Sequence, residues 1–383
     1  MSGGGLVGAL SGVPWRRARN VAAGLDLTRS TGARYAWQRW EEERRWKGAI
    51  VEARNSAYAG IWGEAAEQLG SGFRALGDGL FEFGDGSDLV LVRRGHAAID
   101  SRAALDAAFD KPKHHALLGR EGIPVPDHLE FAAQNADQAI GFLERAGSAV
   151  VVKPAAGTGA GSGVTSGITT APELRRAVLR ASRSASRLQV ERQADGEEYR
   201  VLLLDGEVID VVRRHRPRVR GDGRSTIAEL VGAENHRRLA ADGLERLRWL
   251  KVDLDCVLTL QRQGLRLSSV PARDTSVVLK QVVNQNAAAE NETVHESLAD
   301  ELVAEVVAAA RTVGIRLAGV DIVTSELGSS LARAGGVVLE VNADPGIHHH
   351  YAVADRSGAT RVAVPILRTI LREHARGKET IAR

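Results

Sequence analysis

The sequence of 383 residues predicts a mixed α+β protein with more than one lobe. Helix-like and strand-like segments follow one another without the strict alternation of a doubly wound parallel sheet. Two strand-like segments, 199–204 and 207–212, are separated only by Asp205-Gly206, a sequence typical of a two-residue hairpin turn. Hydrophobic residues make up 44% of a chain that is long for one compact domain, so we expect two or three packed lobes.

The elements before residue 130 are predicted from periodicity and from residues that begin or end helices. Large apolar residues at helical spacing among charges predict a helix over 36–70, and short strand-like pieces follow within 80–95. Asp110 caps a predicted helix that has Pro112 in its first turn and ends at Gly122.

The remaining elements are predicted by the same signals. Thr170-Ala-Pro-Glu173 is a capping box, which predicts a helix over 171–183. Helices are also expected over most of 225–263, over 298–313 with Gly314 at its end, and near the C terminus. The strands are predicted at 149–153, 164–169, 188–191, 277–283, 319–324 and 337–342.

The composition argues against several classes of protein. With 51 basic and 48 acidic residues and only 4% aromatics, the chain lacks the dense basic and aromatic face of a nucleic-acid binder. Its single cysteine, Cys256, excludes an intrachain disulfide. The first apolar run precedes the basic pair instead of following it, unlike a signal peptide, and no run has the length of a membrane span. We therefore expect a soluble cytoplasmic protein.

A metal site is predicted where two strands near the C terminus pair. In the strand 337–342, alternation places Val338, Glu340 and Asn342 on one face. If Thr324 opposes Val337 across the hairpin, Asp321 falls opposite Glu340. Two opposed carboxylates repel unless a cation lies between them, and such oxygens suit Mg²⁺. The alternative is a pair of polar strands facing solvent.

A phosphate-binding loop is predicted after the strand that ends in Lys153-Pro154. The chain has no Gly-x-x-x-x-Gly-Lys-Ser/Thr motif and no Gly-x-Gly-x-x-Gly motif. The run at 157–163 instead has a glycine at every second position, including Gly159, Gly161 and Gly163. Its backbone N–H groups could surround a polyphosphate to which the lysine supplies charge. A surface glycine hairpin explains the same run equally well.

An anion site is predicted at the end of the hairpin 199–212. If Leu204 opposes Glu207, then Glu198 falls opposite Arg213. This pair could be only a surface salt bridge. Together with Arg200, Arg214 and Arg216, however, it favours a site for an acidic group. The alternative for the arginines of 213–220 is a solvated charged loop, which is the preferred interpretation of the outer ones.

These motifs, in this order and spacing, resemble the ATP-grasp region of cyanophycin synthetase and related amino-acid and peptide ligases. The resemblance covers about 88–355. The motifs that carry it are Asp110-Lys111, Gly122-Ile-Pro-Val-Pro126, Val151-Val-Lys-Pro154 with its glycine run, Glu191, Gly196-Glu-Glu-Tyr-Arg200, Arg213-Arg214, Gly221-Asp-Gly-Arg-Ser-Thr-Ile227, Gly319-Val-Asp321 and Leu339-Glu-Val-Asn-Ala-Asp-Pro-Gly346.

The resemblance implies an ATP-grasp fold, in which two α+β lobes grip ATP, and an ATP-dependent carboxylate–amine ligase that works through an acyl phosphate. It implies that Asp321 and Glu340 hold one Mg²⁺, that Glu340 and Asn342 hold a second, and that Mn²⁺ can substitute. The other implied roles are phosphate binding by Lys111 and Lys153, an adenine-side hinge at Glu191, ribose binding by Glu198, nucleotide-site contacts by Arg200 and the loop glycines, and stabilisation of the acyl phosphate by Arg213 or Arg214 and the Gly346 amide.

The implied organisation is an N-terminal α/β region (1–109), a lobe with the glycine-rich loop (110–195), a lobe with the metal and substrate site (196–356), and a helical tail (357–383). Amino acids or short peptides are the implied substrates, and a homodimer is the implied assembly. A glutathione-synthetase-like ligase, a D-Ala–D-Ala-like ligase and a non-catalytic nucleotide-binding protein remain alternatives. One departure concerns the substrate end, where Asn286-Ala-Ala-Ala-Glu-Asn-Glu-Thr293 replaces the family's Ser-Thr-Gly-Gly stretch.

Overall fold

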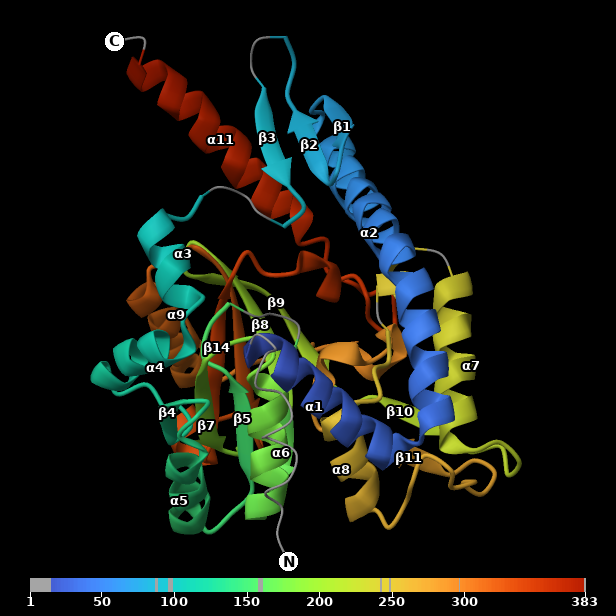
Figure 1. Cartoon of the computed structure of the whole chain (residues 1–383). Helices are drawn as coiled ribbons and strands as arrows, with labels where there is room; N and C mark the ends of the chain where they lie inside the picture. The colour runs from blue at the N-terminus through green and yellow to red at the C-terminus, as the bar shows by residue number, and fades with distance from the viewer. Residues whose placement is uncertain are drawn as a thin grey trace, which may run out of the picture.

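The computed structural model describes residues 15–86, 89–95, 99–157, 161–241, 243–247, 249–295 and 297–381. Two antiparallel sheets lie side by side, each covered by helices, and the long helix α2 and the C-terminal helix α11 extend from them (Figure 1). This arrangement confirms the predicted α+β class. None of the described helices is long and apolar enough to cross a membrane.

The helices are α1 (Trp15–Thr31), α2 (Ala33–Leu69), α3 (Arg102–Ala108), α4 (Lys111–Arg120), α5 (Ala136–Ala146), α6 (Ala171–Ala181), α7 (Ile227–Ala240), α8 (Leu254–Arg262), α9 (Asp300–Val313), α10 (Leu331–Ala334) and α11 (Ala363–Ile381). Their ends follow the predicted signals. Asp110 accepts a hydrogen bond from the Lys113 amide at the start of α4, and Thr170 and Glu173 form the capping box of α6. Gly314 ends α9 in the left-handed conformation.

The strands in the described ranges form four sheets. The first lobe holds β4 (His128–Ala132), β7 (Arg187–Arg192), β5 (Val150–Pro154) and β6 (Thr165–Ile168), in that order. The second lobe holds β12 (Asn291–Thr293), β9 (Glu207–Arg214), β8 (Glu197–Leu204), β13 (Leu317–Thr324) and β14 (Val337–Ala343). The small sheets are β1 (Phe73–Gly77) with β2 (Leu80–Phe83) and β3 (Val90–Arg93), and β10 (Arg218–Arg220) with β11 (Ser276–Val278).

The strand predicted at 277–283 is shorter than expected. β11 ends at Val278, after which the Leu279 amide donates to the carbonyl of Pro217. The chain then enters a 3-10 turn over Val283–Gln285. The apolar run is therefore divided between a short strand and a turn that lines the cleft described below.

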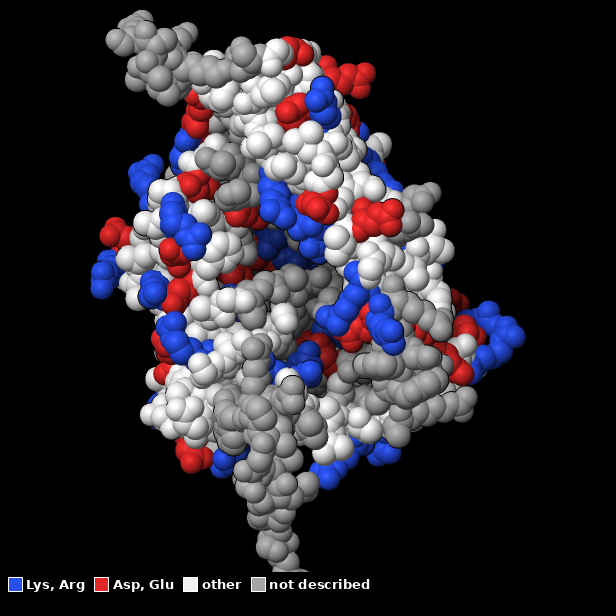
Figure 2. Space-filling view, turned by 45° about the horizontal axis from the view of Figure 1, so that its top comes forward, with Lys and Arg blue, Asp and Glu red and all other residues white. Residues whose placement is uncertain are grey.

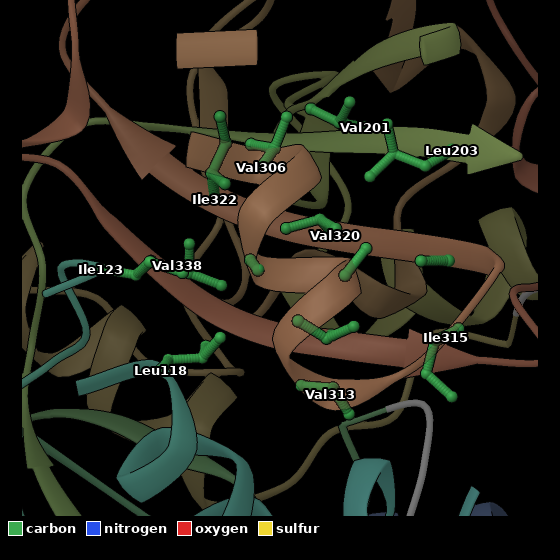
Figure 3. Packing of buried hydrophobic residues seen from close by; sticks show 14 of the residues in the cluster. Leu118, Ile123, Val201, Leu203, Val306, Val313, Ile315, Val320, Ile322 and Val338 are labelled. Atoms are coloured by element: carbon green, nitrogen blue, oxygen red, sulfur yellow. The ribbon is translucent and has the colours of Figure 1, made fainter. Parts of the chain in front are cut away.

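The largest core lies between the second sheet and helices α3, α4 and α9. Val320 and Ile322 of β13 point into it and meet Val306 and Val313 of α9 (Figure 3). Val338 of β14 also lies in this core and is fully buried (Figure 3). On the opposite face of the same sheet, Leu202, Leu204 and Leu317 pack in a second core with α2 and α11, and polar side chains of the cleft lie beside them.

A β-bulge in β14 corrects the predicted alternation. Asp321 pairs with Glu340, as predicted, but Val337 pairs with Val323 and not with Thr324. The register shifts by one residue between these pairs. Val338 consequently lies on the core side, away from Glu340, whereas the sequence placed both on one face.

A second bulge corrects the predicted pairing of the other hairpin. Leu204 opposes Glu207, as expected, but the register shifts between Leu203 and Leu202. Glu198 therefore opposes Arg214, and the predicted pairing of Glu198 with Arg213 is wrong. Neither bulge has a glycine or proline that would have marked it in the sequence.

Candidate active site

A cleft of about 490 Å³ lies between the two sheets. β5 and β7 form its wall in the first lobe, and β8, β13 and β14 form its wall in the second. Lys and Arg side chains gather around the hollow in the middle of the face shown in Figure 2. The described part of the cleft is thus lined by charged groups that two separate sheets bring together.

The three predicted metal ligands meet on one wall of the cleft. Asp321 and Glu340 lie opposite each other on neighbouring strands, and Asn342 lies two residues beyond Glu340. The Asn342 Nδ2 donates to Oδ2 of Asp321 across 3.1 Å and to the carbonyl of Gly319 across 3.1 Å. This hydrogen bond holds the Asn342 side chain beside Asp321, so the oxygens of both side chains lie close together on the cleft wall.

Asp321 is held by an arginine instead of standing alone. Nε and Nη2 of Arg200 donate to its two oxygens across 2.7 and 2.6 Å, and both side chains are buried. Burial alone would raise the pKa of Asp321, but the Arg200 guanidinium outweighs burial and lowers it. Asp321 is therefore ionised and oriented before any ligand binds.

Both lysines implied in phosphate binding pair with carboxylates that line the cleft. Lys111 Nζ lies 3.0 Å from Oε1 of Glu340, and Lys153 Nζ lies 2.7 Å from Oε2 of Glu191. Gln189 Nε2 donates to the same Glu191 oxygen across 2.9 Å. Since the lysines come from the first lobe or its edge, the Lys111–Glu340 pair joins the two sides of the cleft.

A buried, neutral histidine, His115, forms hydrogen bonds with both walls of the cleft. His115 Nδ1 accepts from Gln189 Nε2 across 3.2 Å, and its Nε2 donates to the carbonyl of Leu339 across 2.9 Å. Burial and then the charge of Lys153 lower the pKa of His115. The imidazole is therefore uncharged, and the hydrogen bonds require its proton on Nε2.

Glu198 lines the cleft and is paired with Arg214. Arg214 Nη1 donates to Oε1 of Glu198 across 3.1 Å, and Nη2 donates to Oδ1 of Asn284 across 2.6 Å. Burial raises the pKa of Glu198 to about 7, although Arg214 opposes the rise, and the charges of Asp321 and Glu340 add to it. A buried carboxylate with a raised pKa is typical of a functional site, where a positively charged group can bind beside it.

Arg213 does not join the cleft. It lies on the other face of β9, with its guanidinium 5.4 Å from the Tyr199 ring and 3.6 Å from Glu292. The bulge in β9 explains this placement, because it turns Arg214 instead of Arg213 toward Glu198. Of the two arginines that the sequence proposed, only Arg214 lines the cleft.

The glycine run is only partly described. Gly159 lies outside the described residues. Gly161 lines the cleft with a φ of +68°, and a Cβ there would lie 2.8 Å from Nδ2 of Asn284. Gly163 packs behind the loop against Pro154, where a Cβ would lie 3.0 Å from the proline ring.

The turn that contains Gly346 closes the cleft at the end of β14. Gly346 lines the cleft and precedes the 3-10 turn Ile347–His349. Tyr58 of α2 forms a 3.0 Å hydrogen bond with Nδ1 of His348 in this turn. The long N-terminal helix thus fixes the segment that presents the Gly346 amide.

Sequence reasoning did not find several of these residues. Asn284, Gln189, His115 and Tyr58 all contact predicted site residues or the turn that carries one. None belongs to a motif, and Tyr58 is 290 positions away from its partner. Only the departure at 286–293, two residues after Asn284, signalled this part of the chain.

The oxygens on the cleft wall fit a hard cation. Asp321, Glu340 and Asn342 supply oxygens on one wall, and each carboxylate oxygen keeps lone pairs beyond the one that its arginine or lysine partner uses. Within the described ranges, no group of three or more His, Cys, Asp or Glu side chains forms a metal site.

Comparisons with known proteins agree with the predicted resemblance. No protein-family model matches the chain. Cyanophycin synthetase of Synechocystis sp. (strain ATCC 27184 / PCC 6803 / Kazusa) is 32% identical over 292 residues, which are 73% of this chain and 32% of that protein. The glutathione biosynthesis bifunctional protein GshAB of Mannheimia succiniciproducens is 31% identical over 244 residues, or 61% of this chain and 31% of that protein.

Solved structures that resemble the chain include the ATP-grasp ligase PsnB complexed with minimal precursor, with a TM-score of 0.42 and 19% identity, covering 71% of this chain and 63% of that chain. Another is a bifunctional glutathione synthetase from Pasteurella multocida, with a TM-score of 0.49 and 23% identity, covering 80% of this chain and 42% of that chain. The resemblance to cyanophycin synthetase is confirmed. The chain spans about a third of the length of the two curated relatives, cyanophycin synthetase and GshAB.

Proposed function

We infer that this homologue of the cyanophycin synthetases and GshAB is an ATP-dependent ligase that joins a carboxylate to an amine. The observation that carries the proposal is the opposed pair Asp321–Glu340, which faces Lys111 and Lys153 across one cleft. Carboxylates on one wall can hold cations, and lysines on the other can hold phosphates. That combination suits phosphoryl transfer to a substrate held between the walls.

Each group in the cleft has a distinct proposed role. Lys111 and Lys153 exchange their carboxylate partners for nucleotide phosphates, Glu191 lies on the adenine side, and Glu198 accepts from the ribose. Asp321, Glu340 and Asn342 hold two Mg²⁺ ions, which would offset phosphate charge during transfer. Mn²⁺ is the expected substitute.

The reaction proceeds in two steps. A substrate carboxylate oxygen attacks the γ-phosphorus of ATP, the bond to the β-phosphate oxygen breaks, and ADP and an acyl phosphate form. The amine nitrogen then bonds to the acyl carbon, the bond from that carbon to the phosphate oxygen breaks, and the proton that the nitrogen loses leaves with the phosphate. Arg214 and the Gly346 amide stabilise the negative charge that develops at the acyl group. The loop that contains Gly161 excludes water, because acyl phosphates hydrolyse readily.

The lobe boundaries support the same function. The first lobe, 110–195, would supply the lysines and the glycine loop, and the second, 196–356, would supply the metal and acyl sites. Residues 1–109 and 357–383 would support them from outside, as the Tyr58–His348 hydrogen bond illustrates. Amino acids or short peptides are the proposed substrates.

The test is phosphate release from Mg-ATP across a matrix of amino acids and short peptides, with amide formation followed by mass. Release that requires one pair of substrates and disappears in Glu340→Ala is expected. Glu207→Ala, which removes an exposed carboxylate at the β8–β9 turn, should behave as wild type. ATP binding without release for any pair would contradict the ligase and favour a non-catalytic nucleotide-binding protein.

A further inference from the structure

Two arginines on the second-lobe side of the cleft lack the carboxylate partner that other cleft cations have. Lys111, Lys153, Arg200 and Arg214 each pair with a carboxylate. The exposed side chains of Arg216 and Arg218 line the same cleft, and neither forms an ion pair with any residue that the structure describes.

Arg192 also lines the cleft without an ion pair among the described residues, but it lies at the end of β7 in the first lobe. Arg216 and Arg218 lie together on the segment that continues from Arg214. Arg214 is proposed to stabilise the reacting acyl group, and Arg216 and Arg218 come two and four residues after it in the chain. Arg192 belongs to a different strand.

The backbone that carries the two arginines is fixed. The His215 amide donates to the carbonyl of Glu290 across 2.8 Å, and Asn286 Nδ2 donates to the carbonyl of His215 across 3.0 Å. The Arg218 amide donates to Oε1 of Glu290 across 2.6 Å. A rigid backbone lowers the entropic cost of presenting two guanidinium groups to a ligand.

The residues that fix this segment belong to the stretch that departs from the family pattern. Asn286 and Glu290 lie within 286–293, where the family has Ser-Thr-Gly-Gly. Asn286 Nδ2 also donates to Oδ1 of Asn291 across 2.6 Å, and Glu290 accepts from the Ala287 amide across 2.6 Å. Hydrogen bonds within 286–293 therefore hold this stretch in place, and it in turn holds the backbone of residues 215–218.

The next arginine supplies a matched comparison. In β10 the side chains alternate, so Val219 enters a core while Arg218 and Arg220 share the other face. Arg220 Nε lies 3.0 Å from Oδ1 of Asp274, and Arg220 does not line the cleft. Arg218 and Arg220 thus differ in whether the protein itself neutralises them.

We propose that Arg216 and Arg218 bind a second carboxylate of a peptide-like substrate, beyond its reacting group. This inference rests on the proposed ligase function and names its substrate class. Extended chain advances about 3.3 Å per residue, so Arg216 and Arg218 lie up to roughly 7 and 13 Å beyond Arg214. That reach fits an acidic peptide of two to four residues and exceeds a single amino acid.

The experiment compares triglutamate with triglutamine, binding to the full chain by calorimetry with Mg-AMPPNP saturating. Paired guanidinium–carboxylate hydrogen bonds predict that wild type binds triglutamate about ten- to a hundredfold more tightly. Arg216→Gln/Arg218→Gln should abolish that preference. Arg220→Gln should keep it, and circular dichroism checks that each variant is folded.

Two results would overturn the inference: equal binding of the two peptides by wild type, or a preference that survives in the double variant. Weaker AMPPNP binding by the double variant with the peptide preference unchanged would instead assign the arginines to the nucleotide. The proposed ligase function fails separately, through absence of phosphate release while the peptide preference and its loss are still observed.

Discussion

Arg200 binds both oxygens of Asp321, and the two side chains form a buried fork between β8 and β13. A carboxylate that is proposed to hold a cation is thus already neutralised by the protein. The same holds for Glu340, which Lys111 neutralises. These two pairs balance each other's charge, so nucleotide and Mg²⁺ would enter together, each taking over one partner of an existing pair.

Replacing Arg200 by methionine should destabilise the fold strongly. The change leaves Asp321 ionised and buried with only Asn342 and a more distant Arg214, 3.8 Å away. Breaking a buried ion pair on one side costs about 3–5 kcal/mol in the free energy of unfolding. Denaturant unfolding followed by circular dichroism measures it.

The exposed pair Arg220–Asp274 is the control for this change. Arg220→Met should lower the free energy of unfolding by less than about 1 kcal/mol. Equal losses in the two variants would show that the fork contributes no more than a surface pair. Adding Asp321→Asn to Arg200→Met should restore part of the loss.

Glu198→Gln should change the dependence of stability on pH. The raised pKa of Glu198, about 7, means that the folded state keeps a proton that the unfolded state releases near 4.5. The contribution of Glu198 to the free energy of unfolding is thus complete below pH 4.5 and lost as pH rises through about 7. The variant should gain stability relative to wild type between these values, by on the order of 3 kcal/mol.

The neighbouring carboxylate provides the control. Glu197 is exposed, and its Oε2 lies 3.6 Å from His215 Nδ1. Glu197→Gln should follow the wild-type curve over pH 4.5–8 in thermal unfolding. A Glu198→Gln curve parallel to wild type would show that Glu198 titrates as an ordinary glutamate.

Lys280→Met should weaken the joint between α6 and α8. Asp253 accepts from Lys280 Nζ across 2.8 Å and from Arg180 Nη2 across 2.8 Å, and it caps α8. Burial would raise the pKa of Asp253, but Arg180 and Lys280 outweigh burial and lower it to about 2. Loss of the lysine should cost about 3 kcal/mol near neutral pH.

Lys251→Met is the matched change at an exposed lysine, 3.8 Å from Glu43. It should alter the free energy of unfolding by less than about 0.5 kcal/mol. Acid should reduce the difference between wild type and Lys280→Met, because the stabilisation of ionised Asp253 by Lys280 is present in wild type above the unfolded-state pKa of 3.8 and is lost as pH falls through about 2. A difference that stays constant down to pH 2 would contradict the ion-pair explanation.

The elements and the central register could be predicted because their signals are local. Thr170 and Glu173 define a helix start within four residues, and alternation carried the correct pairing of Asp321 with Glu340. Near the loop of that hairpin the predicted pairing was wrong by one residue, because a bulge makes Val337 pair with Val323 instead of Thr324. The residues that matter for the site lay on the correct side of the shift.

The partners of the site residues could not be predicted, because they depend on tertiary packing. The bulge in β9 decides whether Arg213 or Arg214 meets Glu198, and no residue type in that strand marks it. The fork between Arg200 and Asp321 joins residues 121 positions apart. The sequence analysis assigned Arg200 to the nucleotide and Asp321 to Mg²⁺, whereas in the folded protein the two side chains pair with each other.

Gly161→Ala should disturb the cleft more than Gly157→Ala. Both glycines have left-handed backbones, with φ of +68° and +73°, so each alanine costs a similar strain of about 1 kcal/mol. A Cβ at Gly157 meets open space among the described atoms, whereas at Gly161 it would lie 2.8 Å from Nδ2 of Asn284 and 2.9 Å from Cγ1 of Val282. The alanine at 161 would therefore push Asn284 away from Arg214.

ATP affinity, measured by calorimetry in Mg²⁺, separates the contact from the backbone strain. Gly161→Ala should bind ATP about tenfold more weakly than Gly157→Ala, because the loop can no longer lie against Asn284. Asn284→Ala combined with Gly161→Ala should recover part of the affinity, since the smaller side chain leaves room for the new methyl group. Equal affinities for the two glycine variants would show that the approach of Gly161 to Asn284 has no part in forming the nucleotide site.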